Sequence, residues 1–288
     1  VISLFFFFFQ LISSGFVFNL LRILETILFI PTFNDHYATI IIYTFNAGNY
    51  DSLRNCGFTW EPGPFGSFLN IAIFISLIKS KFAFNKHFFV FTIALITTLS
   101  TTAYLAFIVI LLWRFYNLKN KKIVLLSIPL IILIFSYIFI NTPFLKDKIE
   151  SEYFSSEVDL TFHLHNPDPT RNISLNRFPG FLLNLIDFAE NPIIGFGGKF
   201  EKTQARLYGT QITSTSGLGN WLAQFGAVGM IFFIFSWFKS LNLLKNIFDF
   251  KGTIALFSVI LIISFGFNQN YAVIYFSFML FYYFIKPK

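Results

Sequence analysis

Residues 54–65 read Arg54-Asn55-Cys56-Gly57-Phe58-Thr59-Trp60-Glu61-Pro62-Gly63-Pro64-Phe65 and lie between long apolar runs. A cation, a carboxylate seven residues later and a turn rich in proline and glycine are costly in a helix that faces lipid. The stretch therefore predicts a functional region of a membrane protein. Other segments of the chain can contribute to this region only if they reach the same side of the membrane as residues 54–65.

The composition is that of a protein embedded in a membrane. Of the 288 residues, 55% are hydrophobic and 12% are charged, phenylalanine occurs 45 times, and the mean hydropathy is +0.67. Roughly a quarter of the residues of a soluble domain are charged, so this composition excludes a soluble fold. The apolar runs are continuous, which predicts helices and not an outer-membrane barrel. We expect an all-α polytopic membrane protein with about eight transmembrane or half-membrane helices.

The net charge of +7 does not indicate a nucleic-acid partner, because the basic residues lie at the ends of apolar runs, where they set topology. The one cysteine, Cys56, excludes an internal disulfide. The chain starts without methionine and is apolar from its first residue. We expect it to be the C-terminal part of a longer protein, with residues 1–288 forming one integral membrane domain.

The apolar runs predict the membrane spans. Residues 1–21 are expected to form one span that ends near Arg22, and residues 23–64 a loop with interfacial helices. Further apolar runs occupy residues 65–79, 87–113, 123–140, 216–238, 253–267 and 269–285.

The run 87–113 is too long for a single crossing. As one helix, its 27 residues would extend about 40 Å, against a hydrocarbon core of about 30 Å. It is interrupted by Thr97-Thr98-Leu99-Ser100-Thr101-Thr102, and hydroxyl groups satisfy backbone groups where a chain turns near the membrane. We therefore predict two short helices that meet at Ser100.

The distribution of basic residues supports this turn. With it, the short segments 79–86, 114–122, 239–252 and 286–288 share one side and hold 12 of the 21 basic residues against one acid. The positive-inside rule makes these segments cytoplasmic. The Arg54–Glu61 stretch, the Ser100 turn and the long loop 141–215 are then expected to face outward.

The loop 141–215 is the largest polar segment, and loops of this length are usually functional. It contains a predicted helix at residues 178–190, followed by Asn191-Pro192-Ile193-Ile194-Gly195-Phe196-Gly197. The proline and the glycines of this turn predict a rigid bend and a close approach of two backbones.

Arg54 and Arg177 are the leading candidates for binding an anion. Most arginines outside a membrane are solvated or anchor lipid headgroups. Arg177, however, precedes the predicted helix and its rigid turn, and Arg54 is expected to be held by the turn at residues 60–64. Each guanidinium offers a planar fork of donors and stays charged, so two of them suit a diphosphate.

Glu61 is the leading candidate for a proton acceptor, because its place between Trp60 and Pro62 at the start of a span predicts partial desolvation. The alternatives are that Glu61 pairs with Arg54 or caps the following helix. Ser100 would need an adjacent base to act as a nucleophile, and without one it is better explained as a polar turn.

No cofactor is expected. The spacing of His163, His165 and Asp168 matches no common zinc site, so we predict no bound metal. The sequence contains neither a phosphate-binding glycine loop nor a nucleophile elbow.

Four segments, in the same order, resemble the bacterial O-antigen polymerase and ligase superfamily, and the resemblance covers most of the chain. The first two are Arg54-Asn55-Cys56-Gly57-Phe58-Thr59-Trp60-Glu61-Pro62-Gly63 and Thr97-Thr98-Leu99-Ser100-Thr101-Thr102-Ala103-Tyr104. The third is Arg177, fifteen residues before the proline of Asn191-Pro192-Ile193-Ile194-Gly195-Phe196-Gly197. The fourth is Gly217-Leu218-Gly219-Asn220-Trp221-Leu222-Ala223-Gln224-Phe225-Gly226-Ala227-Val228-Gly229.

The resemblance implies a membrane glycosyltransferase. Such an enzyme polymerises polyprenyl-diphosphate-linked repeat units into O-antigen or capsular polysaccharide, at the outer face of the bacterial inner membrane, in which it is a multi-pass protein. Glu61 and Arg177 would be catalytic. The residues that would bind the diphosphate or the glycan are Arg54, Trp60, Arg171 and Ser100. The implied partners are the lipid-linked glycans, membrane lipid, and the chain-length regulator and flippase of the same pathway.

One position departs from the pattern of that superfamily. Many members, the ligases above all, have a histidine just before the fourth segment, where this chain reads Ser214-Thr215-Ser216. The departure favours a polymerase over a ligase that transfers glycan to lipid A core or to protein, and it makes Glu61 the stronger candidate for a base. A transporter or flippase is the alternative from another class. It would require ionisable or broken positions within the spans, whereas these are nearly free of charge.

Overall fold

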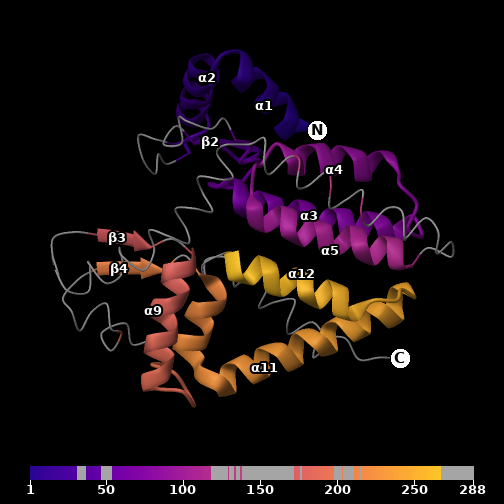
Figure 1. The fold of residues 1–288 in the computed structure, drawn as a ribbon. Coiled ribbons are helices and arrows are strands. Elements are labelled where there is room, and N and C mark those ends of the chain that lie inside the picture. Colours follow the sequence, from indigo (N-terminus) through magenta and orange to yellow (C-terminus); the bar gives the residue numbers. More distant parts are fainter. Residues whose placement is uncertain are drawn as a thin grey trace. The chain divides into compact units, whose positions relative to one another are not determined.

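The computed structural model describes residues 1–30, 37–46, 54–117, 172–175, 177–197, 211–214 and 216–266, together with Pro129, Leu133, Tyr137 and Thr203. Within these residues the protein is mostly helical, with eight helices and four short strands (Figure 1). It forms two compact units, residues 1–133 and 134–288, and each is described by itself. The predicted spans 123–140 and 269–285 lie almost entirely outside the described residues.

The first apolar run forms two helices, α1 (Ile2–Ile12) and α2 (Ser14–Ile27), instead of one span over residues 1–21. The chain leaves the helical conformation at Ser13, where φ is −150° and ψ is 92°. Serine and glycine favour helices weakly, and Ser13-Ser14-Gly15 places three such residues in a row. The prediction of a single span is therefore wrong, since an 11-residue helix such as α1 extends only about 16 Å.

Residues 37–46 form a β-hairpin, where an interfacial helix was expected. Strands β1 (Tyr37–Ile40) and β2 (Tyr43–Asn46) are antiparallel, with Tyr37 opposite Asn46 at the open end. The segment is rich in β-branched and aromatic residues, which favour strands. One buried cluster joins the hairpin to α2; its members are Val17, Leu21, Ala38, Ile40, Tyr43 and Phe45.

Three further helices complete the first unit: α3 (Pro62–Lys79), α4 (Lys86–Ile96) and α5 (Thr101–Tyr116). The predicted division of the run 87–113 is confirmed, because α4 and α5 are separate helices and Ser100 is the N-cap of α5. Helix α3 packs tightly on α5: a Cβ added at Gly66 would lie 2.5 Å from the Cβ of Ala103. The side chain of Asn70 joins the two helices where they are this close, since its Nδ2 donates to the Ala103 carbonyl at 3.0 Å.

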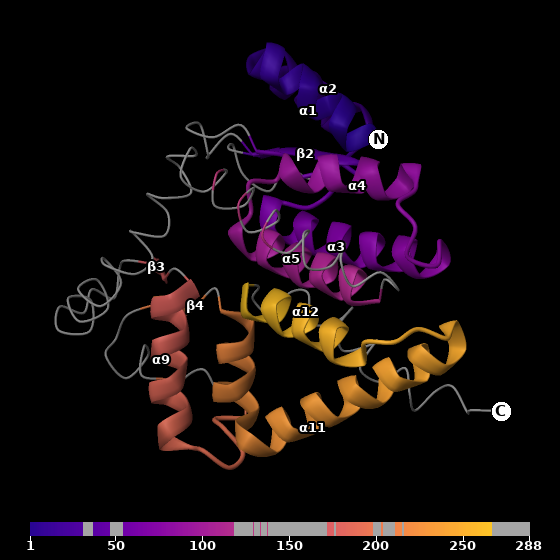
Figure 2. The same cartoon turned by 45° about the vertical axis from the view of Figure 1, so that its right-hand side comes forward.

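The second unit contains α9 (Arg177–Glu190), α11 (Gly217–Phe248) and α12 (Thr253–Gly266), and a parallel pair of strands, β3 (Asn172–Leu175) and β4 (Gln211–Ser214). The predicted helix at 178–190 is confirmed as α9. Helix α11 bends sharply at Gly226, where φ is 63° and ψ is −166°. As Figure 2 shows, the part of α11 before the bend lies beside α9 and the part after it beside α12.

The turn after α9 fills the bend in α11. In a continuous helix the N–H groups of residues 227 and 228 would donate to the carbonyls of residues 223 and 224. All four groups instead bond to the turn: Phe196 N to Ala223 O (3.0 Å), Gly197 N to Gln224 O (2.9 Å), Ala227 N to Pro192 O (2.8 Å) and Val228 N to Ile193 O (3.0 Å). The expected close approach of two backbones is confirmed, since a Cβ at Gly195 would lie 2.4 Å from Ala223 O.

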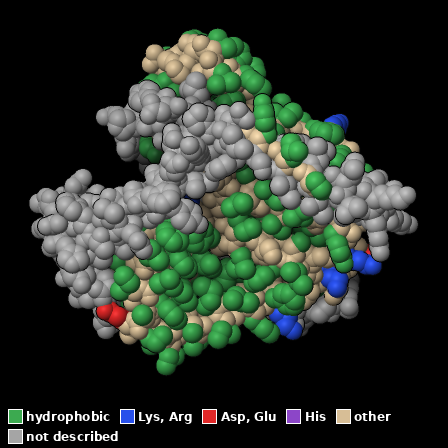
Figure 3. Space-filling view, viewed as in Figure 1, with side chains coloured by type: hydrophobic (Ala, Val, Ile, Leu, Met, Phe, Trp, Pro, Cys, Tyr) green, Lys and Arg blue, Asp and Glu red, His purple; other side chains and the backbone are tan. Residues whose placement is uncertain are grey.

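Two of the described helices, α3 and α11, are long and apolar enough to cross a membrane, and four shorter ones are apolar. Hydrophobic side chains cover most of the visible face over α11 (Figure 3). The large hydrophobic residues exposed after its bend include Val228, Ile231, Phe232, Ile234, Phe235 and Phe238. These features support association with a membrane by length and composition alone.

Candidate functional site

Arg54 reaches the C-terminal end of α4. Its Nε donates to the carbonyl of Thr98 and one terminal nitrogen to the carbonyl of Leu99, each at 3.0 Å. A cation is favourable at this end of a helix, where carbonyl groups lack partners within the helix. Arg54 is thus held by the turn before α5. The expected support from residues 60–64 stays a prediction, as does the assignment of Arg54 to a diphosphate.

The other carbonyls at the C-terminal end of α4 also accept hydrogen bonds from nearby residues. The partners are Thr97 Oγ1 to Ala94 O (2.7 Å), Thr98 Oγ1 to Leu95 O (2.7 Å), Tyr104 Oη to Ile96 O (2.6 Å) and Asn55 N to Thr97 O (3.0 Å). Such pairing is needed where a chain turns in a poorly hydrated environment. These bonds confirm that the Arg54–Glu61 stretch and the Ser100 turn lie at the same end of the helices.

Asn55 and Cys56 are buried residues of the Arg54–Glu61 stretch. Asn55 is fully buried; its Nδ2 donates to Thr97 Oγ1 at 2.9 Å and its Oδ1 accepts from Gly57 N at 3.0 Å. Burial raises the pKa of the Cys56 thiol to about 12. Because the thiolate is the reactive form, Cys56 is inert at neutral pH.

Glu61 is exposed at the N-cap position of α3, so the expected partial desolvation is wrong for this structure. Its side chain makes no capping hydrogen bond, and among the described residues it has no ion pair, which removes both structural alternatives considered above. The backbone around it is held by Thr59, whose Oγ1 donates to the carbonyls of Cys56 (2.8 Å) and Glu61 (2.7 Å). The backbone of Glu61 is therefore held in place, while its carboxylate is exposed.

Ser100 is 2% exposed, and its Oγ accepts from the backbone N–H of Ala103 at 3.4 Å. This is the polar turn that the sequence favoured. Its placement does not support a contact with substrate, which stays a prediction. Trp60, by contrast, is 44% exposed beside Glu61.

In the second unit, Arg177 begins α9 and is anchored at the end of α12. Its Nε donates to the carbonyl of Gly266 at 2.9 Å, and the residue is half-buried. Within the described part of the chain, its two terminal nitrogens have no hydrogen-bond partner. The guanidinium is therefore fixed through Nε, and its two terminal nitrogens are the donors that would bind an oxyanion.

The start of α11 holds serines where the resemblance leads one to expect a histidine. Ser214 Oγ accepts from Asn184 Nδ2 (2.9 Å) and from the N–H of Ser216 (3.2 Å), and Ser216 Oγ accepts from Gly219 N (3.3 Å). These hydroxyls support the backbone between β4 and α11. They offer no group with a pKa suited to a general base at neutral pH.

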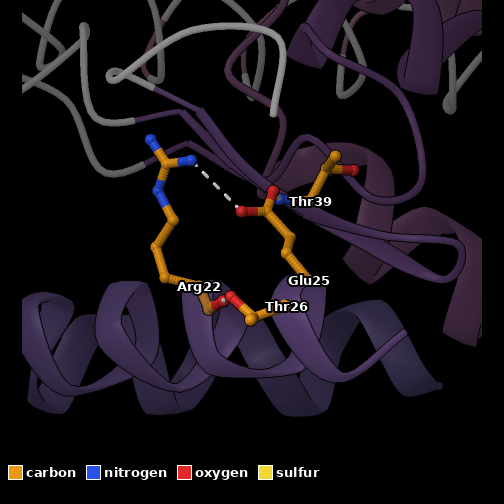
Figure 4. A network of polar contacts seen from close by, with 4 residues as sticks. All are labelled: Arg22, Glu25, Thr26 and Thr39. Carbon is orange, nitrogen blue, oxygen red and sulfur yellow. Dashed lines mark hydrogen bonds and ion pairs between the residues drawn. The ribbon is translucent and has the colours of Figure 1, made fainter. Parts of the chain in front are cut away.

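The sequence analysis missed Glu25, which is 1% exposed in the first unit. One carboxylate oxygen accepts from Arg22 at 3.2 Å and the other from the backbone N–H of Thr39, so the side chain ties α2 to the hairpin (Figure 4). The spacing of Arg22 and Glu25 indicates a helix pair, but no local signal indicates that the carboxylate is buried.

We expect Glu25→Gln to destabilise the protein by about 1–3 kcal/mol, because the amide keeps the acceptor for Thr39 but loses the charged bond to Arg22. Glu25→Ala loses both contacts and should cost more, about 3–5 kcal/mol. Thermal unfolding in detergent measures the difference. Asp249→Asn is the matched control, since Asp249 is exposed and should change stability by less than about 0.5 kcal/mol. Equal melting of both Glu25 variants and the wild type would contradict a structural role.

Several predicted residues lie outside the described residues: Arg171, His163, His165 and Asp168. Arg54, Trp60, Glu61 and Ser100 belong to the first unit and Arg177 to the second. The structure therefore brings the first four to one end of a helix group and describes Arg177 separately.

Comparisons with known proteins found no match, either to a model of a protein family, to a curated protein or to a solved structure.

Proposed function

We propose that this chain is a multi-pass glycosyltransferase of the bacterial inner membrane, with about eight membrane helices. It polymerises polyprenyl-diphosphate-linked oligosaccharide repeat units into O-antigen or capsular polysaccharide on the outer face. The observation that carries the proposal is Arg177, whose Nε is anchored on Gly266 while its terminal nitrogens have no hydrogen-bond partner among the described residues. A guanidinium held in this way suits a diphosphate oxyanion.

The reaction is a displacement at the anomeric carbon of the donor sugar. The acceptor hydroxyl oxygen forms a bond to this carbon, and the bond from the carbon to the lipid diphosphate breaks, its electron pair leaving with the diphosphate. Arg177 stabilises the charge that grows on the leaving group, which is where fixed donors accelerate a reaction most. Glu61 takes the acceptor proton, and its exposed carboxylate is accessible to a bulky glycan.

The bend in α11 is a feature also found in transporters, whose broken helices line a substrate site. Here the four backbone groups released at the bend bond to the turn at residues 192–197. They are therefore paired within the protein, whereas in transporters such groups coordinate the substrate or ion. The serines at residues 214 and 216, in place of a histidine, favour a polymerase over a ligase.

The test is an assay of the purified protein in detergent with a polyprenyl-diphosphate-linked repeat unit and no added nucleotide or metal. A ladder of lipid-linked oligomers is the expected product. Transfer of glycan only to added lipid A core would indicate the ligase reaction instead. Movement of the lipid-linked unit across a vesicle membrane without bond formation would overturn the proposal in favour of transport.

A further inference from the structure

The open end of the β-hairpin lies against the Arg54–Glu61 stretch. Thr44 N donates to the Gly57 carbonyl at 2.6 Å, and Asn46 Nδ2 donates to the Trp60 carbonyl at 3.5 Å. Strand β2 is therefore bonded at two points to the segment that carries Glu61. The pairing of Tyr37 with Asn46 then brings the Tyr37 side chain to the same place.

The side chains gathered there are a phenol, an amide and a carboxylate. Asn46 hydrogen-bonds the Tyr37 hydroxyl, and Glu61 lies close enough to act on it electrostatically. Burial, and secondarily the negative charge of Glu61, raise the pKa of Tyr37 above its usual range. The phenol therefore stays protonated at neutral pH and remains a hydrogen-bond donor.

Two exposed aromatic residues, Phe58 and Trp60, belong to the same segment as Glu61. Trp60 is 44% exposed and Phe58 is 50% exposed. Phe58 is supported from behind by Phe65 and Phe68, with ring centroids 5.7 Å and 5.1 Å away. The segment that carries Glu61 therefore presents two aromatic rings at its surface, and an aromatic ring offers a flat apolar face.

We propose that Tyr37, Asn46, Trp60 and Glu61 form a subsite for a pyranose ring of the acceptor glycan, with Tyr37 donating to a sugar hydroxyl. A pyranose presents an apolar C–H face, which packs on an aromatic ring, and hydroxyl groups at its edge, which pair with a phenol, an amide and a carboxylate. Tyr37 is thereby a specificity-determining residue that the sequence did not indicate. This inference rests on the proposed function and names the acceptor chemistry that the residues around Glu61 would recognise.

The experiment uses the repeat-unit oligosaccharide released from its lipid by mild acid. This probe lacks the diphosphate, so its binding does not depend on Arg177. Binding to the purified full chain in detergent is measured by isothermal titration calorimetry. Wild type should bind, and Tyr37→Phe should bind about three- to tenfold more weakly, as expected for the loss of one neutral hydrogen bond.

Tyr43→Phe is the matched control. It removes a hydroxyl from the same hairpin, but this hydroxyl is buried and donates to Gln10 at 2.7 Å. It should lower the melting temperature and leave glycan affinity unchanged. A Tyr37→Phe protein that binds as tightly as wild type would overturn the subsite.

The outcomes separate this inference from the proposed function. A wild-type protein that elongates lipid-linked units but does not bind the released glycan in the millimolar range would overturn the subsite and leave the polymerase intact. A wild-type protein that neither elongates nor binds would overturn both. Binding weakened equally by Tyr37→Phe and Tyr43→Phe would indicate a general effect on the hairpin and would also overturn the role of Tyr37.

Discussion

Arg177→Lys should stop growth of the polymer at single repeat units in cells that make it, and Arg177→Ala should do the same. Lysine keeps the charge and retains a donor for the Gly266 carbonyl, but it loses the second edge of the guanidinium that would bind the diphosphate. Loss of one fixed donor to a developing oxyanion slows a reaction about 100- to 1,000-fold. A gel of lipid-linked glycans from variant and wild-type cells measures the chain length.

The control for Arg177 is Lys245→Gln, which removes an exposed positive charge from α11 of the same unit. It should leave chain length unchanged. Both Arg177 variants are also purified and their melting compared with wild type, so that loss of polymer is not confused with loss of protein. If folded Arg177→Lys and Arg177→Ala proteins support wild-type chain length, the diphosphate role of Arg177 is wrong.

Gly195→Ala should prevent accumulation of folded protein, whereas Gly197→Ala should not. Both glycines have φ of +65°, but a Cβ at Gly195 would lie 2.4 Å from Ala223 O, and at Gly197 no atom lies within 4 Å. Gly197→Ala therefore costs only the backbone strain, about 1–2 kcal/mol. Gly195→Ala also displaces the turn from the bend in α11 and leaves buried backbone groups unpaired, at about 1–3 kcal/mol each.

Size-exclusion chromatography and melting in detergent compare the two variants. Gly226→Ala tests the same contact from the side of α11, because a Cβ at Gly226 would lie 2.5 Å from Gly195 N. Since both alanines disrupt one contact, the double variant should cost little more than either single one. Equal stability of the Gly195 and Gly197 variants would show that the turn does not support the bend.

Local patterns in the sequence predicted several elements of the fold. The hydroxyl-rich segment around Ser100 predicted the break between α4 and α5, and the apolar pattern after Arg177 predicted α9. The proline and glycines at 192–197 predicted a close backbone approach. These predictions succeeded because each depends on the conformational preferences of neighbouring residues.

Predictions of partners were less successful. Arg54 bonds to carbonyls more than forty residues away, and Glu61 is exposed where burial was expected. The burial of Glu25 and the approach of Tyr37 to Glu61 had no local signal. Each depends on how the hairpin packs, and the hairpin itself was mistaken for part of a helical loop.

The sequence by itself determined the mostly helical character of the protein and the places where its helices turn. Continuous apolar runs favour helices, and clusters of serine, threonine, proline and glycine interrupt helices through their own backbone preferences. Only the tertiary structure decided which distant groups meet: Arg54 at the end of α4, Arg177 at the end of α12, and the turn at 192–197 within α11. The physical reason is that backbone groups freed at a helix end or bend must find partners, and packing alone determines which residues are near enough to provide them.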